Sequence, residues 1–207
     1  MWIGAGPGEP INAPLGKRLA VFAYGLVSYA LFFATFLYAA GWVGNFLTPT
    51  SIDGAPTDPL WFAALVNVGL LLVFAVQHSV MARPAFKRWW TRIIPEPAER
   101  ATYTLLSSVA LILMFALWRP MGGVVWEIQN PVGRAIMYGV FAFGWLLVLA
   151  TTFLINHFDL FGLRQVWLYL RNRSYTHLKF TTPCPYRFVR HPLYCGWLFA
   201  FWARPRM

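Results

Sequence analysis

Four long stretches of the chain are apolar and contain no lysine, arginine, aspartate or glutamate. These stretches are residues 19–43, 60–81, 101–118 and 135–155. A helix needs about 20 apolar residues to cross the roughly 30 Å hydrocarbon core of a bilayer. The pattern therefore predicts an all-α integral membrane bundle with four full transmembrane helices.

A fifth apolar stretch, residues 192–203, is shorter than the other four. As a helix it would rise about 18 Å, against the roughly 30 Å needed to cross the bilayer. Arg204 and Arg206 follow it, and an arginine deep in a bilayer costs about 2.5–3.5 kcal/mol. We therefore expect a short, truncated and poorly supported fifth helix. Its charged end must bend back to the interface or be covered by other segments.

Residues 158–173 show a different pattern, in which apolar residues recur at helical spacing. The apolar stripe consists of Leu163, Val166, Trp167 and Leu170, and the opposite side carries Arg164, Gln165, Arg171 and Asn172. A helix with one apolar and one basic side is typical of the membrane surface. We expect an interfacial amphipathic helix here, either as the cover of a pocket or as a simple linker.

Composition agrees with a membrane protein. The chain is 58% hydrophobic and 12% charged, with a mean hydropathy of +0.53, whereas soluble domains carry roughly 25% charged residues. The uncharged run 19–43 is longer than the roughly 7–15 apolar residues of a signal peptide, so it should remain as a helix. A chain of 207 residues is the size of one domain, and we expect residues 1–207 to form a single membrane-embedded domain.

The basic residues predict an orientation. Lys17 and Arg18 precede the first apolar stretch, residues 44–59 contain no lysine or arginine, and residues 82–100 contain five. By the positive-inside rule, the N-terminus, residues 82–100 and the chain after residue 155 face the cytoplasm, most simply across a bacterial inner membrane. The net charge of +10 then reflects topology and attraction to lipid headgroups. Nucleic acid binding is disfavoured because the charge is divided among short juxtamembrane segments.

A basic turn leads into the fifth apolar stretch. Residues 190–196 read RHPLYCG, with Pro192 where a helix accepts proline best, in its first turn. The N-terminus of a helix favours an anion, and Arg187 and Arg190 add guanidinium groups suited to a carboxylate or phosphate. On spacing alone, an anion site and a helix start anchored at the membrane interface are equally good interpretations.

This turn resembles the signature of the isoprenylcysteine carboxyl methyltransferase superfamily, which are membrane enzymes that use S-adenosylmethionine. Two further segments narrow the resemblance, residues 77–87 (QHSVMARPAFK) and 156–165 (NHFDLFGLRQ). Together they resemble the methanethiol S-methyltransferase family, which is similar to NnrU-like proteins. The resemblance extends over nearly the whole chain from about residue 16.

The resemblance implies a cofactor, a substrate and a set of residues. It implies that S-adenosyl-L-methionine donates a methyl group to methanethiol, a small thiol, and that dimethyl sulfide forms. The residues that it places at the cofactor are Tyr186, Arg187, Arg190, His191, Tyr194 and Gly196. The alternatives are a methyltransferase for another lipid-like thiol, carboxylate or amine, and a truncated NnrU-like protein without activity.

Methyl transfer to a thiol requires a proton acceptor, because a thiol with a pKa of about 8.5 is mostly protonated at neutral pH. A neutral histidine can take that proton. His78 and His157 both lie at predicted cytoplasmic helix ends, and we regard both as candidates for the base. Arg164 or Arg190 could hold the resulting thiolate.

The family pattern also contains a part that this sequence does not. Its members continue through further apolar sequence to a paired-glutamate motif that helps to hold the cofactor, and no Glu-Glu pair occurs here. The chain therefore resembles a C-terminally shortened member, and we expect it to bind the cofactor weakly.

Other chemistry has little support. His177, Cys184 and His191 are spaced by seven residues, which is no recognised ligand pattern, so we expect no metal. The sequence has no CxxC pair, and none of the motifs of phosphoryl transfer, Rossmann cofactor binding or hydrolase chemistry occurs.

Overall fold

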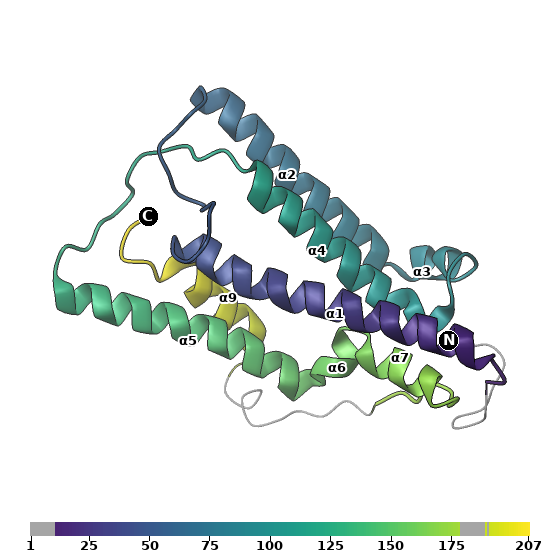
Figure 1. Ribbon diagram of the computed structural model, residues 1–207. Helices are drawn as coiled ribbons and strands as arrows, with labels where there is room; N and C mark the ends of the chain where they lie inside the picture. Colours follow the sequence, from purple (N-terminus) through teal and green to yellow (C-terminus); the bar gives the residue numbers. More distant parts are fainter. Residues whose placement is uncertain (1–10, 179–188, 190) are drawn as a thin grey trace. The chain divides into compact units, whose positions relative to one another are not determined.

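The computed structural model describes residues 11–178, 189 and 191–207, and helices make up most of them (Figure 1). The helices long and apolar enough to cross a membrane are Leu15–Gly44, Leu60–Ala82, Glu96–Leu117 and Pro131–Ile155. Among the described residues there is no β-strand, only an isolated antiparallel bridge between Glu127 and Arg206. The prediction of an all-α membrane bundle is confirmed, and the chain is a multi-pass membrane protein.

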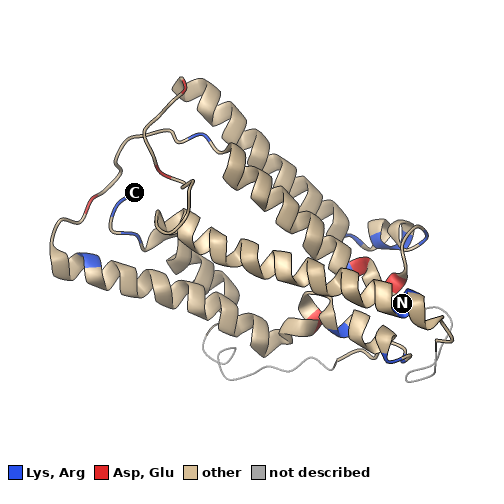
Figure 2. Cartoon of the chain, viewed as in Figure 1, with Lys and Arg blue, Asp and Glu red and all other residues tan. Residues whose placement is uncertain are grey.

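The bounds of the described helices are α1 Leu15–Gly44, α2 Leu60–Ala82, α3 Pro84–Trp90, η1 Glu96–Ala98, α4 Glu99–Leu117, α5 Pro131–Ile155, α6 His157–Leu160, α7 Leu163–Leu170 and α9 Pro192–Trp202. Their connections include a single residue, between α2 and α3, and residues 45–59, between α1 and α2. Charged side chains lie near helix ends and in the connections, and the middles of the long helices carry none (Figure 2). This is the distribution that a hydrocarbon layer imposes.

The chain forms two compact units. The first, which we call the α6–α7 unit, comprises Met1–Thr35, Leu70–Leu113 and His157–Phe180. The second, the α9 unit, comprises Phe36–Gly69, Met114–Asn156 and Thr181–Met207. Helices α1, α2 and α4 contribute residues to both. The single membrane-embedded domain stays a prediction.

Buried hydroxyl groups inside the spans are satisfied locally. The side chains of Ser28, Thr35, Thr102, Ser108 and Thr151 each donate to the carbonyl four residues earlier, over 2.7–2.9 Å. A hydroxyl that is hydrogen-bonded in this way can lie in an apolar interior without a desolvation penalty. These residues therefore allow helix contacts without introducing free polar groups into the bilayer.

The predicted amphipathic helix is divided into two helices. Gly162 separates α6 from α7 with φ +90, and a Cβ at this position would lie 2.7 Å from the backbone nitrogen of Ala101. Only glycine accepts both the left-handed backbone and the close approach of α4. In α7, Val166 of the predicted stripe is fully buried with Val21 and Ala101. Part of the stripe therefore packs on protein, while Trp167 is 48% exposed. Gln165, which the pattern placed on the polar side, is buried.

The short fifth helix is present as α9, but the expectation that it would be poorly supported is wrong. It lies alongside α5 (Figure 1), and Cβ atoms at Gly144 and Gly196 would come within 2.5 and 2.9 Å of the partner helix backbone. Small residues allow two membrane helices to approach this closely.

The charge that follows α9 is covered as well. Arg204 is buried and donates to Asp53 Oδ2 at 2.6 Å and to the Val43 carbonyl at 3.0 Å. Its own carbonyl accepts from Trp126 Nε1 at 3.0 Å. A partner carboxylate and a carbonyl thus offset part of the cost that the sequence assigned to a free arginine in the bilayer.

Candidate active site

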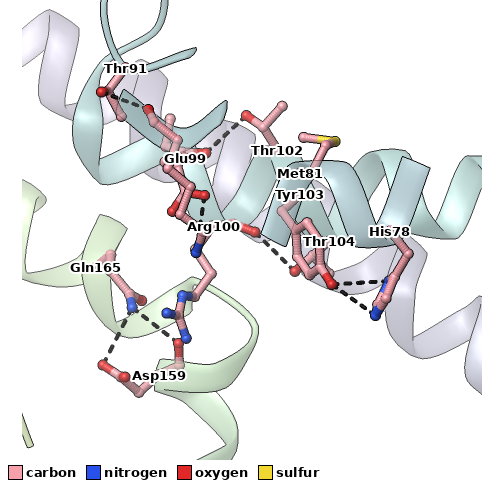
Figure 3. A network of polar contacts seen from close by, with 12 residues as sticks. His78, Met81, Thr91, Glu99, Arg100, Thr102, Tyr103, Thr104, Asp159 and Gln165 are labelled. Carbon is pink, nitrogen blue, oxygen red and sulfur yellow. Dashed lines mark hydrogen bonds and ion pairs between the residues drawn. The ribbon is translucent and has the colours of Figure 1, made fainter. Parts of the chain in front are cut away.

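Asp159 in α6 is the centre of a polar cluster in the α6–α7 unit. Its carboxylate accepts from Arg164 Nη1 and from the Tyr175 hydroxyl, both at 3.1 Å, and from Gln165 Nε2 at 3.4 Å. Gln165 also donates to the Asp159 carbonyl at 3.0 Å. Figure 3 shows Gln165 bonded to Asp159. The cluster joins α6, α7 and the segment after α7.

Arg164 makes several further contacts within this cluster. Besides Asp159 it donates to the Thr176 carbonyl at 2.8 Å and to the Thr176 hydroxyl at 2.7 Å, and its guanidinium lies 5.2 Å from the centre of the Tyr175 ring. Burial, together with the negative Asp159, raises the pKa of Tyr175, so its hydroxyl remains a donor. The structure thus gives Arg164 a compensating carboxylate, and its predicted contact with a thiolate stays a prediction.

His157 begins α6 and is enclosed by aromatic rings. His157 is 2% exposed, and its Nε2 lies 2.7 Å from the Tyr29 hydroxyl. The rings of Phe158 and Phe161 meet the imidazole edge-on, with centroids at 5.4 and 4.9 Å. Burial lowers the pKa of His157, because the charged imidazolium is disfavoured away from water. The residue is therefore neutral at pH 7.

His78 lies near the end of α2 and is exposed. The Tyr103 hydroxyl on α4 is 2.8 Å from Nε2 and 3.0 Å from Nδ1, and the Ser107 hydroxyl is 3.3 Å from Nδ1 (Figure 3 shows the Tyr103 contacts). Gln77 shares the Ser107 hydroxyl at 3.3 Å. His78 is thus an accessible imidazole whose ring is oriented from the neighbouring helix.

The beginning of α9 contains the described part of the predicted cofactor site. His191 is the N-cap residue, and among the described residues no side chain makes a capping hydrogen bond to this helix. Tyr194 is 68% exposed, and its ring centroid lies 5.3 Å from that of His191. Gly196 is packed against Val148, so helix packing alone requires a glycine there. Tyr186, Arg187 and Arg190 lie outside the described residues.

The predicted site residues fall in both units. His78, His157 and Arg164 belong to the α6–α7 unit, and His191, Tyr194 and Gly196 belong to the α9 unit. In the part of the chain that the structure describes, no contact joins His78 to His157, and no cluster of three or more His, Cys, Asp or Glu residues is suited to a metal ion. Their assembly into one active site stays a prediction.

Sequence reasoning missed three tyrosines that orient these groups, namely Tyr29, Tyr103 and Tyr175. Tyr29 and Tyr103 lie within apolar helices, where a tyrosine is usually an interface anchor. Only the fold shows that each hydroxyl meets a histidine.

Comparison with known proteins places the chain among its relatives. The family model described as NnrU protein matches residues 66–204. A methanethiol S-methyltransferase of Crocosphaera subtropica is 54% identical over 92% of this chain and 75% of its own length. One of Mycobacterium tuberculosis is 50% identical over 92% of this chain and 78% of its own. Nurim of Sus scrofa is more distant, 28% identical over 71% of this chain and 63% of its own. No solved structure matches. The chain therefore belongs to the NnrU family, in the branch that contains the methanethiol S-methyltransferases.

Proposed function

We propose that this protein transfers the methyl group of S-adenosyl-L-methionine to methanethiol and so forms dimethyl sulfide. The observation that carries the proposal is the identity of 54% and 50%, over 92% of this chain, to two proteins named methanethiol S-methyltransferase. Relatives this similar over nearly the whole chain support the same reaction.

The described part of the cofactor site is consistent with the amino-acid end of S-adenosylmethionine. The N-terminus of α9, where the His191 side chain makes no capping hydrogen bond, favours a carboxylate. The imidazole of His191 can donate a hydrogen bond, and the exposed ring of Tyr194 offers a face to a cation. The bound cofactor would supply an activated methyl group on a sulfonium. We propose that His191 and Tyr194 hold it, with Tyr186, Arg187, Arg190 and Gly196.

We propose that His78 accepts the proton of methanethiol. In the transfer, the S–H bond of the thiol breaks and its proton passes to an imidazole nitrogen. The thiol sulfur forms a bond to the methyl carbon as the bond between that carbon and the sulfonium breaks, which would leave S-adenosylhomocysteine. His78 supports this role because its side chain is exposed and its ring is oriented by Tyr103. His157 is the second candidate, since burial keeps its imidazole neutral, and the rings around it restrict access.

The membrane itself supports the choice of substrate. Most of the α2 surface is exposed and apolar, including Leu65, Leu72 and Val76, as expected for contact with lipid tails. A small apolar thiol dissolves in that layer and can reach the end of α2 laterally. We propose a site that faces the cytoplasm in a bacterial inner membrane, where S-adenosylmethionine is available.

The direct test is product analysis with a set of acceptors. Membranes that contain the protein are supplied with S-adenosylmethionine and methanethiol, ethanethiol or a prenylated cysteine, and the products are identified by chromatography and mass spectrometry. We expect dimethyl sulfide, at a higher rate than any other product. Preferential methylation of the prenylated carboxylate would replace the proposal with a lipid-like acceptor.

A further inference from the structure

Helix α3, between two membrane spans, presents an aromatic cluster to the exterior. The rings of Phe86, Trp89 and Trp90 contact one another, with centroids 5.4–5.8 Å apart. Trp89 is 51% exposed, and Ile93 in the turn after the helix is 61% exposed. Tryptophan and isoleucine exposed beside aromatic rings form a surface suited to the interfacial layer of a bilayer.

The same segment carries three exposed arginines, Arg83, Arg88 and Arg92. Within the described residues, none of the three guanidinium groups has an ion pair or a hydrogen bond to a side chain, whereas Lys87 pairs with Glu99 at 3.5 Å. Figure 2 shows the basic colour on α3 and on the loop that follows it. The local acidic side chains are Glu96 and Glu99, so this segment keeps a positive charge.

The position of α3 fixes what this surface can meet. Helix α2 ends at Ala82, and the next span begins at Glu96, so the connection of residues 83–95 leaves and re-enters the membrane at one face. It is therefore held at the depth of the lipid headgroups. Aromatic rings prefer that layer, and guanidinium groups bind phosphate there with bidentate hydrogen bonds.

We infer that α3 and the turn through Ile93 form a binding surface for anionic phospholipids. Phe86, Trp89 and Ile93 insert at the level of the glycerol groups, and Arg83, Arg88 and Arg92 bind headgroup phosphates. The charge complementarity selects anionic over zwitterionic lipids, because a zwitterionic headgroup adds a cation that the arginines repel. This inference does not depend on the reaction that the protein catalyses.

The test compares two double variants that lose the same charge. Arg88→Gln with Arg92→Gln removes two arginines of the surface, and Arg134→Gln with Arg173→Gln removes two exposed arginines elsewhere. The full chain in neutral detergent is titrated with phosphatidylglycerol or phosphatidylcholine, and bound lipid is counted by native mass spectrometry. Each arginine near a headgroup is expected to contribute about fivefold in affinity. The α3 double variant should therefore bind phosphatidylglycerol about 25-fold more weakly.

The control variant should retain phosphatidylglycerol binding, and phosphatidylcholine should bind weakly to all forms. Equal losses in both double variants would show a net-charge effect and overturn the inference, as would unchanged binding in the α3 variant. Competition by millimolar inorganic phosphate would show that the arginines bind free phosphate instead of lipid.

A second measurement tests the aromatic side of the surface. The difference in fluorescence between the native chain and Trp89→Phe, in vesicles with phosphatidylglycerol, isolates Trp89. We expect quenching by lipids brominated on the acyl chains and shielding from acrylamide in water. Strong acrylamide quenching without bromolipid quenching would place Trp89 in water and contradict the inference.

Discussion

In the α6–α7 unit, polar side chains from different segments meet around Asp159, whereas in the α9 unit the closest helix contact is made by glycines and by backbone. Asp159 accepts three side-chain donors. At the α5–α9 contact, by contrast, Gly144 lies against the backbone of Ala200. Directional hydrogen bonds fix the orientation of side chains, while a glycine contact fixes only the distance between helices.

The difference bears on the roles that we propose. The histidines and Arg164 of the α6–α7 unit are oriented by neighbours, as a group that accepts a proton must be. Tyr194 in the α9 unit is highly exposed on a helix that packing holds in place. A site for a bound cofactor needs such accessible groups on a rigid element.

The largest effect is expected from breaking the glycine contact. A Cβ at Gly144 would lie 2.5 Å from the Ala200 nitrogen and 2.8 Å from the Phe199 carbonyl carbon. Gly144→Leu should destabilise the protein by about 3 kcal/mol, which lowers the melting temperature in detergent by about 6–12 °C. Gly139→Leu is the matched control in the same helix, since nothing lies within 4 Å of its Cβ. Equal melting temperatures for the two variants would refute tight α5–α9 packing.

A smaller loss is expected from breaking the polar cluster. Asp159→Asn removes the negative charge that three donors share, and a charged hydrogen bond contributes about 1.5–3 kcal/mol. The control is Asp58→Asn, because Asp58 meets Arg119 at 3.5 Å on a more exposed surface, and such pairs contribute about 0–1 kcal/mol. The melting temperature of Asp159→Asn should therefore lie a few degrees below that of Asp58→Asn. A larger loss of melting temperature in Asp58→Asn would contradict the greater contribution that we assign to the Asp159 cluster.

The smallest effect concerns the pH dependence of stability through His157. Burial lowers its pKa in the folded protein, so the unfolded chain binds the proton more readily. The contribution of this group to the free energy of unfolding is fully present above the ordinary pKa of about 6.5. It is lost as the pH falls below that value. Melting temperatures of the native chain should therefore fall below about pH 6.5, and those of His157→Gln should fall less. Parallel curves would mean that His157 takes up its proton without cost.

The membrane helices could be predicted because long apolar runs are sufficient to define them, but their boundaries depended on local contacts. The fourth run was predicted to begin at residue 135, whereas α5 begins at Pro131. The Asn130 side chain accepts from the Val132 and Gly133 nitrogens at 2.9 and 3.1 Å. This cap extends the helix past a charged residue, where hydropathy gives no signal.

The sequence pattern gave much less indication of the tertiary contacts. Arg204 looked unsupported because its partner Asp53 is 151 residues away along the chain. Gly162 looked like an ordinary position in one amphipathic helix, and only the approach of α4 explains the break. For the candidate site, residue types indicated the histidines and Arg164, but their tyrosine, serine and aspartate partners depend on which helices become neighbours.

The most direct test of the proposed reaction follows the methyl group itself. S-adenosylmethionine with a deuterated methyl group and unlabelled methanethiol are given to membranes that contain the protein, and the headspace gas is analysed by mass spectrometry. We expect dimethyl sulfide with one deuterated methyl group, even if it forms slowly, and a reduced rate in His78→Gln. Unlabelled dimethyl sulfide only, or labelled product no greater than in membranes without the protein, would contradict the proposed reaction.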